Sequence, residues 1–219
     1  HCAKEDVIVI LGVPNINSYR YFIKFLKFKE VFNLTYYILP KNIFNVVGNG
    51  KLSFLNIFSK AYSFMSIIFA YIASSFVNTK ERTEHKYRIV QDETFLSKRF
   101  KDKKYKTINT DNISFTYVMC NEDNIKAVYL MHFSEKGLKS FKALVRSVYY
   151  IYTHENYDLI MYVGTMNFKQ SLLLKVPRKL EPKKLPFTYN MLNSENNDDF
   201  KDMNIKEKWD FSLMNFDVR

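Results

Sequence analysis

The stretch Val7-Ile8-Val9-Ile10-Leu11-Gly12-Val13-Pro14-Asn15 (residues 7–15) decides how the chain begins to fold. Its first five residues are apolar and mostly β-branched, which predicts a strand buried on both faces. Gly-x-Pro-Asn then ends the strand, and Asn17 or Ser18 can cap a helix that follows. A second apolar run over 33–39 ends at Pro40. Residues 7–39 are therefore predicted as strand, helix and strand, which is part of an α/β layer.

The position of this unit, directly after the first residue, predicts that part of its sheet lies upstream of His1. We therefore expect the chain to be truncated at its N-terminus. The strand at 7–11 would then lack neighbours on one side and pair with the strand at 33–39. Such an arrangement leaves an exposed apolar edge, which is an aggregation hazard.

Composition predicts a folded, cytoplasmic protein of one or two domains. The chain has 219 residues, of which 47% are hydrophobic and 17% aromatic, enough for a sizeable core. Its two cysteines and four histidines lack the spacing of a disulfide framework or a metal site. No charged and apolar secretion signal opens the sequence. The cysteines are Cys2 and Cys120, and the histidines are His1, His85, His132 and His154.

The formal charge of +11 suits a polyanionic partner. The excess is almost entirely lysine, however, in a chain that is also rich in Asn, Ile, Phe and Tyr. Coding by AT-rich DNA produces the same bias without any ligand. We therefore do not expect nucleic acid as a partner.

The most hydrophobic stretch is 61–77, AYSFMSIIFAYIASSFV. A membrane span needs about 20 apolar residues, and this stretch is shorter and carries four serines. It predicts a buried or interfacial helix that packs against protein. Contact with a membrane surface, through this helix and the lysine runs, is the alternative, and it would make the protein peripheral to the membrane.

The pattern becomes regular in the second half of the chain. Strands over 113–120 and 126–133 form a predicted hairpin, and an apolar stripe from Leu138 to Tyr152 predicts a helix. A strand at 158–164, a short helix at 168–176, a strand at 185–191, a polar loop and a last strand over 208–218 complete the prediction. The charged run at 98–106 is expected to face solvent.

This order of elements resembles the GNAT acyltransferase fold, represented twice. Gly12-x-Pro14-Asn15, with Ser18, Phe22 and Phe28 downstream, resembles the strand-to-helix motif of GNAT-like N-acyltransferases, notably large bacterial ones associated with surface polysaccharides. The stretches 95–100 (FLSKRF) and 209–217 occupy the places of two further motifs. The resemblance implies an α/β fold with a mixed sheet flanked by helices.

Three segments follow from the resemblance. Residues 1–45 would be the tail of a first repeat, residues 46–90 a hydrophobic helix and charged linker, and residues 91–219 a fuller second repeat. In this family the amino end of the long helix binds the pyrophosphate of acyl-CoA. The pantetheine arm lies between two diverging strands.

The activity implied is transfer of an acyl group from acyl-CoA, such as acetyl-CoA, to an amine-bearing small molecule or sugar. The amine would attack the thioester directly, and a strand amide would stabilise the developing oxyanion. The resemblance assigns no catalytic residue. The cofactor-binding residues that it implies are Asn15, Ser18, Phe133, Ser134, Lys136 and Gly137.

The loop at 132–140 raises an alternative from another class. It has a single glycine, Gly137, and places Glu135 where phosphates would bind bare backbone N–H groups. A degenerate, non-catalytic acyltransferase repeat that serves docking or homodimerisation is therefore the second hypothesis.

Three titratable residues after the long helix, His154, Glu155 and Asp158, form a candidate general-base cluster. The alternative is structural, because a histidine in the last turn of a helix interacts favourably with the helix dipole.

Overall fold

The computed structural model describes residues 7–47, 52–77, 79–80, 86–90, 92–110, 112–122, 124–192 and 200–216. The predicted turn at 48–50 lies outside these ranges. The helices are α1 (Ile16–Lys24), α2 (Ile43–Val47), α3 (Asn56–Phe76), α4 (Glu93–Arg99) and α5 (Phe141–His154). The strands are β1 (Val9–Gly12), β2 (Lys29–Asn33), β3 (Thr35–Pro40), β4 (Tyr87–Arg88), β5 (Tyr105–Asn109), β6 (Ile113–Glu122), β7 (Ile125–Glu135), β8 (Leu159–Gly164), β9 (Leu174–Lys175), β10 (Pro186–Met191) and β11 (Trp209–Asp210).

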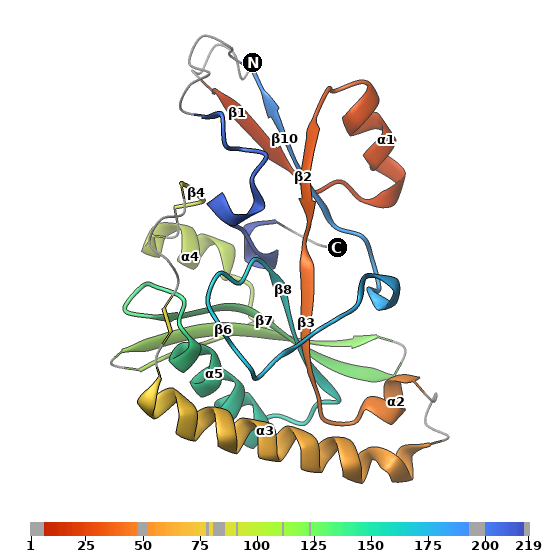
Figure 1. Ribbon diagram of the computed structural model, residues 1–219, viewed down its shortest axis with the longest axis vertical. Helices are drawn as coiled ribbons and strands as arrows, with labels where there is room; N and C mark the ends of the chain where they lie inside the picture. The colour runs from red at the N-terminus through yellow and green to blue at the C-terminus, as the bar shows by residue number, and fades with distance from the viewer. Residues whose placement is uncertain are drawn as a thin grey trace.

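A mixed six-stranded sheet with the order β5-β6-β7-β8-β3-β9 forms the centre of the molecule (Figure 1). Within this sheet only β7 and β8 pair in parallel, and the other pairs are antiparallel. Helices α5 and α3 pack on one face, whereas α4 and the C-terminal segment cover the other. The expected α/β class, a mixed sheet flanked by helices, is therefore confirmed.

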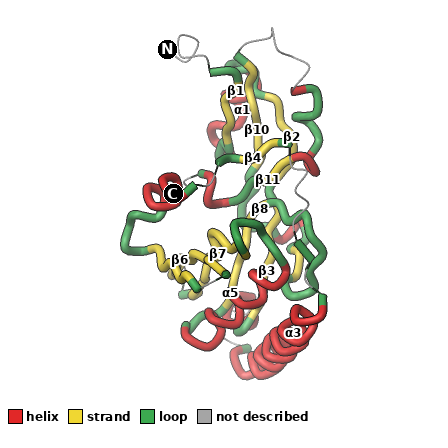
Figure 2. The backbone as a smooth tube through the Cα atoms, turned by 90° about the vertical axis from the view of Figure 1, so that its left-hand side faces the viewer, coloured by secondary structure: helices red, strands yellow, loops and turns green. Residues whose placement is uncertain are grey.

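A smaller sheet, β1-β10-β2, lies at the opposite end of the molecule from α3 (Figure 2). The chain passes from the small sheet into the central sheet and later returns. The chain passes from β2 into β3 across Leu34, and β3 inserts between β8 and β9, pairing with β8 from Thr35–Gly164 to Pro40–Leu159. In the reverse direction, β10 inserts between β1 and β2.

The expected pairing of strand 7–11 with strand 33–39 is therefore wrong. The first strand pairs with β10 in an antiparallel ladder, from Val9–Met191 to Gly12–Thr188. The apolar run at 33–39 is divided between two sheets because the chain changes partner at Leu34. The side chain of Leu34 is fully buried, and the backbone N–H of Leu34 donates to the carbonyl of Leu185 at 2.9 Å.

Two shorter predictions are also corrected. Residues 168–176 form no helix, because the side chain of Gln170 bonds both the N–H and the carbonyl of Leu173, and the chain then pairs with β3 as β9. Among the described residues of the predicted last strand, only β11 is extended in a sheet, and a single 3-10 turn follows at Leu213–Asn215.

Helix α3 packs on the protein through small and polar side chains. The hydroxyl of Ser59 donates to the carbonyl of Lys41 at 2.7 Å, and the hydroxyl of Ser63 donates to the carbonyl of Pro40. The helix is thereby fixed to the end of β3. The buried residues are Asn56, Ser59, Ser63, Ile67, Ala70 and Ser74. The expected contact with protein is present, but it uses the serine face of the helix rather than the large apolar one.

By length and composition, the segment Ser53–Phe76 could cross a membrane. Only 28% of its most apolar window is buried inside the protein.

The C-terminal segment is held directly against the end of β8. Gly164 has a φ of +155°, and a Cβ at this position would lie 2.6 Å from the Cβ of Ser212 and 2.8 Å from the carbonyl oxygen of Phe211. The backbone of Phe211 also accepts a hydrogen bond from the N–H of Thr165 at 2.8 Å. A glycine is therefore required for the segment to lie so close to the sheet.

We expect Gly164→Ala to lower the free energy of unfolding by about 3 kcal/mol or more, because backbone strain and steric overlap add. Urea denaturation of the full chain measures this change. Gly137→Ala is the matched control, since Gly137 has a φ of +80° but no described atom within 4 Å of its added Cβ. Its cost should be limited to strain, about 1–2 kcal/mol. Equal losses in the two variants would contradict the close packing at Gly164.

Candidate functional site

The central sheet opens at its one parallel pair. Strands β7 and β8 pair only from Ala127–Leu159 to Tyr129–Met161, although both continue further. On the other side of β7, the ladder with β6 shifts register so that Met131 has no partner, which is a β-bulge. The bulge and the end of the parallel pairing therefore fall at the same point of β7.

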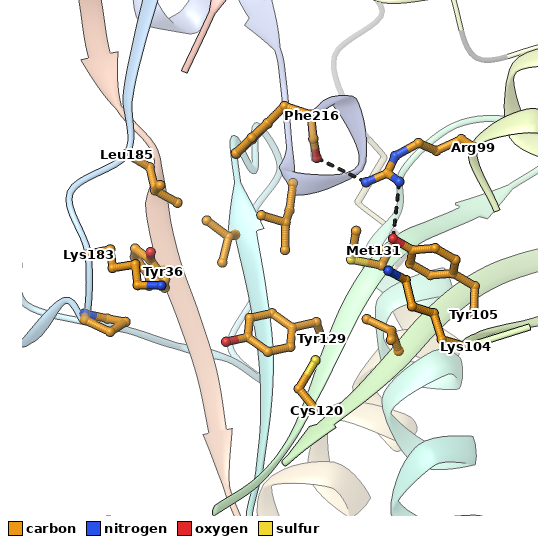
Figure 3. A pocket seen from close by; sticks show the side chains of 14 residues that line it. Tyr36, Arg99, Lys104, Tyr105, Cys120, Tyr129, Met131, Lys183, Leu185 and Phe216 are labelled. Carbon is orange, nitrogen blue, oxygen red and sulfur yellow. Dashed lines mark hydrogen bonds between the residues drawn. The ribbon is translucent and has the colours of Figure 1, made fainter. Parts of the chain in front are cut away.

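A cavity of about 200 Å³ lies at this point, on the face of the sheet opposite α5 (Figure 3). This is below the roughly 300–1,000 Å³ typical of sites for drug-sized ligands, so the cavity suits a small molecule or one group of a larger one. The lining residues are Tyr36, Arg99, Lys104, Tyr105, Val118, Cys120, Tyr129, Met131, Val163, Pro182, Lys183, Leu185, Leu213 and Phe216.

The charged residues that line this pocket are all cationic. Figure 3 shows Lys183 beside Tyr36 on one wall, and Lys104 and Arg99 on the opposite wall. No carboxylate is among the described residues that line it. Opposed cations in a partly enclosed space favour a negatively charged ligand, because low-dielectric walls focus the field.

Tyr36 supplies a permanent hydrogen-bond donor to the same pocket. Burial raises the pKa of its hydroxyl well above the usual value of 10, and nearby Tyr129 and Glu181 raise it further. The hydroxyl therefore keeps its proton at neutral pH.

Arg99 builds one wall of the pocket by holding the C-terminal segment. Its Nε donates to the carbonyl of Met214 at 2.8 Å and its Nη2 to the carbonyl of Phe216 at 3.1 Å. Its Nη1 donates to the hydroxyl of Tyr105 at 3.2 Å. The sequence singled out the motif that contains this arginine, but gave no indication of these three partners.

The N-terminus of α5, where the resemblance places a CoA pyrophosphate, is already occupied by groups of the protein. The N–H of Phe141 donates to the carbonyl of Thr79 at 2.8 Å, and the N–H of Ala143 donates to the hydroxyl of Ser140 at 3.0 Å. That hydroxyl donates in turn to the carboxylate of Glu135 at 3.0 Å. A second anion does not fit beside a buried carboxylate, so these residues do not fit a pyrophosphate.

The cofactor-binding residues implied near this helix lie close to one another in the chain but face different surroundings. Phe133 is fully buried in the core under α5, and Ser134 is buried beside His132. Lys136 and Gly137 form the turn that follows β7, with φ values of +52° and +80°.

The other two implied residues lie at the opposite end of the molecule, at the start of α1 (Figure 1). The side-chain oxygen of Asn15 accepts hydrogen bonds from the N–H groups of Asn17 at 3.0 Å and Ser18 at 2.9 Å. Asn15 therefore caps this helix, so the expected cap at Asn17 or Ser18 is wrong, and the structure does not bring Asn15 and Ser18 together with residues 133–137.

His132 is a buried polar residue that no pattern in the sequence singled out. It is 6% exposed, and its Nε2 lies 3.1 Å from the hydroxyl of Ser134. Its Nδ1 has no hydrogen-bond partner among the described residues. Burial lowers the pKa of the imidazole to about 4, and Lys139 lowers it further against the opposing effect of Asp210. The ring is therefore neutral at pH 7 and lies between two cavities of about 70 and 480 Å³.

Two members of the candidate base cluster after α5, Asp158 and Glu155, bind groups of the protein itself. The carboxylate of Asp158 accepts hydrogen bonds from the side chains of Asn42 and Asn45 and from the N–H of Lys126. Glu155 accepts from Lys106 at 2.7 Å and from the hydroxyl of Tyr117 at 2.6 Å. Among the described residues, no group of three or more His, Cys, Asp or Glu could hold a metal ion.

No family model matches the chain, and no curated protein matches it significantly. Among solved structures, the chain is similar to a GCN5-related N-acetyltransferase from Anabaena variabilis ATCC 29413, with 7% sequence identity and a TM-score of 0.46. The match covers 88% of this chain and 48% of that one, so the chain spans about half the length of the protein that it matches.

We expect the buried His132 to make stability fall as the pH is lowered from about 6.5 to about 4, because only the unfolded chain gains a proton there. The loss should approach 1.4 kcal/mol per pH unit, or about 3 kcal/mol in all. Urea denaturation at several pH values measures it. His132→Gln should flatten this dependence, whereas His154→Gln, at an exposed position, should not. Parallel pH profiles for both variants would refute the assignment.

Proposed function

We propose that the chain is a GNAT-like acyltransferase module that binds a small anionic molecule in the pocket beside Met131. The observation that carries this proposal is the lining of that pocket, with Arg99, Lys104 and Lys183 on its walls and no carboxylate among the described lining residues. A protonated Tyr36 adds a donor that can bond a carboxylate or phosphate oxygen.

The ligand class that we propose is an acidic sugar with an amine. Tyr36, Tyr105 and Tyr129 offer aromatic surfaces for the apolar faces of a sugar ring, and the cations would bind its acidic group. The small volume fits one such ring. An acidic amino sugar also agrees with the surface-polysaccharide context that the sequence resemblance suggests.

Transfer of an acyl group to that amine is the second candidate function. The end of backbone pairing between β7 and β8 favours it. Beyond Tyr129, the edge of β7 no longer pairs with β8. Backbone N–H groups at such an edge, preorganised beside a bulge, would stabilise a developing negative charge. The N-terminus of α5 does not fit the pyrophosphate of acyl-CoA. Acyl-CoA is therefore a co-substrate only if residues outside this helix terminus bind it. We also propose a cytoplasmic location, where acyl-CoA is present.

We expect glucosamine 6-phosphate to raise the melting temperature of the full chain, whereas glucosamine, without the phosphate, should not. The physical reason is the attraction between the phosphate and the cations of the pocket. Lys183→Gln combined with Lys104→Gln should weaken binding at least about tenfold in calorimetry, since each charge-assisted contact contributes about 1.5–3 kcal/mol.

Lys24→Gln is the matched control, because Lys24 is an exposed lysine on α1, far from the pocket. It should bind like the unaltered chain. Equal stabilisation by both sugars, or an equal loss in the control, would contradict the anion site.

Acetyl-CoA should bind no more tightly than about 1 mM, or roughly −4 kcal/mol, in calorimetry at low salt. Glu135→Gln removes the carboxylate but leaves Thr79 and Ser140 on the helix donors, so it should not create a micromolar site. A micromolar site in the unaltered chain would restore the second repeat as a CoA-binding unit. This result would leave the sugar-phosphate test unaffected.

A further inference from the structure

Helix α3 and the turn before it present a continuous row of large apolar side chains to solvent. Phe58 is 69% exposed, Phe69 is 62% exposed and Phe76 is 84% exposed. The full set of exposed large apolar residues in this segment is Leu52, Phe54, Ile57, Phe58, Tyr62, Phe64, Met65, Phe69, Ile72, Phe76 and Val77. A patch of this kind on a protein surface marks a site of interaction.

The orientation of this row is fixed by the opposite face of the helix. Ser59 and Ser63 bond backbone carbonyls at the end of β3, and Asn56 donates to the side chain of Asn45 at 2.8 Å. Turning the helix to bury its phenylalanines would break these bonds and leave polar groups unpaired. The apolar row therefore faces outward along a helical segment of about 36 Å, at 1.5 Å per residue.

The charges around this helix point to an anionic partner. Residues 31–80 contain four lysines, Lys41, Lys51, Lys60 and Lys80, and no Asp or Glu. Arg146 of α5 adds a guanidinium 3.9 Å from the ring centre of Tyr71. An apolar face whose own segment, residues 31–80, carries cationic but no acidic side chains matches the acyl chains and phosphate groups of an anionic lipid surface.

The same charges disfavour a second copy of this chain as the occupant. Each copy carries a net charge of +11, and the helix segment offers no carboxylate to the lysines of a partner. A membrane-crossing position is disfavoured by the serine face, whose hydroxyls bond the end of β3.

We propose that α3 binds in the plane of an anionic membrane surface, with its phenylalanine row among the acyl chains and its bordering lysines at the headgroups. This proposal is independent of the ligand in the pocket.

The test is sedimentation of the full chain with vesicles of phosphatidylcholine alone or mixed with phosphatidylglycerol. We expect binding to the mixed vesicles, weakened by salt. Phe58→Glu combined with Phe69→Glu should reduce the partition coefficient more than about tenfold, and Lys60→Gln about fivefold. Phe25→Glu is the matched control, because Phe25 is 71% exposed but lies beyond the end of α1, far from α3. Thermal melts establish that each variant is folded.

Equal binding to both kinds of vesicle, or an equal loss in the Phe25→Glu control, would overturn the proposal. So would resistance of the bound chain to carbonate extraction, which would indicate a spanning helix. Light scattering completes the test, because a dimer that the double substitution dissociates would assign the face to a second copy instead.

Discussion

Each of the two sheets depends on a strand that comes from the other part of the chain. Without β3, strands β8 and β9 would have no common neighbour, and without β10, β1 and β2 would be separated. The crossing point is Leu34, which is fully buried and bonds the residue that precedes β10. Because backbone groups of a central strand need partners on both sides, neither sheet is complete without a segment that continues into the other.

The pocket is a product of this exchange. Tyr36 reaches it on β3, and Leu185 reaches it just before β10, so both exchanged segments contribute to one wall. The opposite wall depends on Arg99, which binds the C-terminal segment through two backbone carbonyls. Residues from distant parts of the chain thus meet at the bulge of β7, where the sheet itself opens.

The sequence predicted elements well where their pattern was long and strong. The hairpin of β6 and β7 and the helix α5 were expected close to their observed bounds, because alternation and helical periodicity persist over many residues. The pairing of the strands was not predictable, because an apolar run such as 33–39 indicates a buried strand but does not show which strand it pairs with. Arg99 was expected only as part of a motif, without its partners, and His132 was not selected, because their roles rest on backbone carbonyls and burial that only the folded chain creates.

Helix α3 also shows that the sequence alone does not determine which face of an element is buried. Its hydrophobicity predicted a buried or interfacial helix that packs against protein, yet the buried face is mostly polar, because Ser59 and Ser63 bond carbonyls at the end of β3. The outward phenylalanines are the consequence. They lie on the α5 side of the central sheet, whereas the cationic pocket opens on the other side. A chain resting on a membrane through α3 would therefore keep its pocket open to water, and a soluble anionic ligand could still reach it.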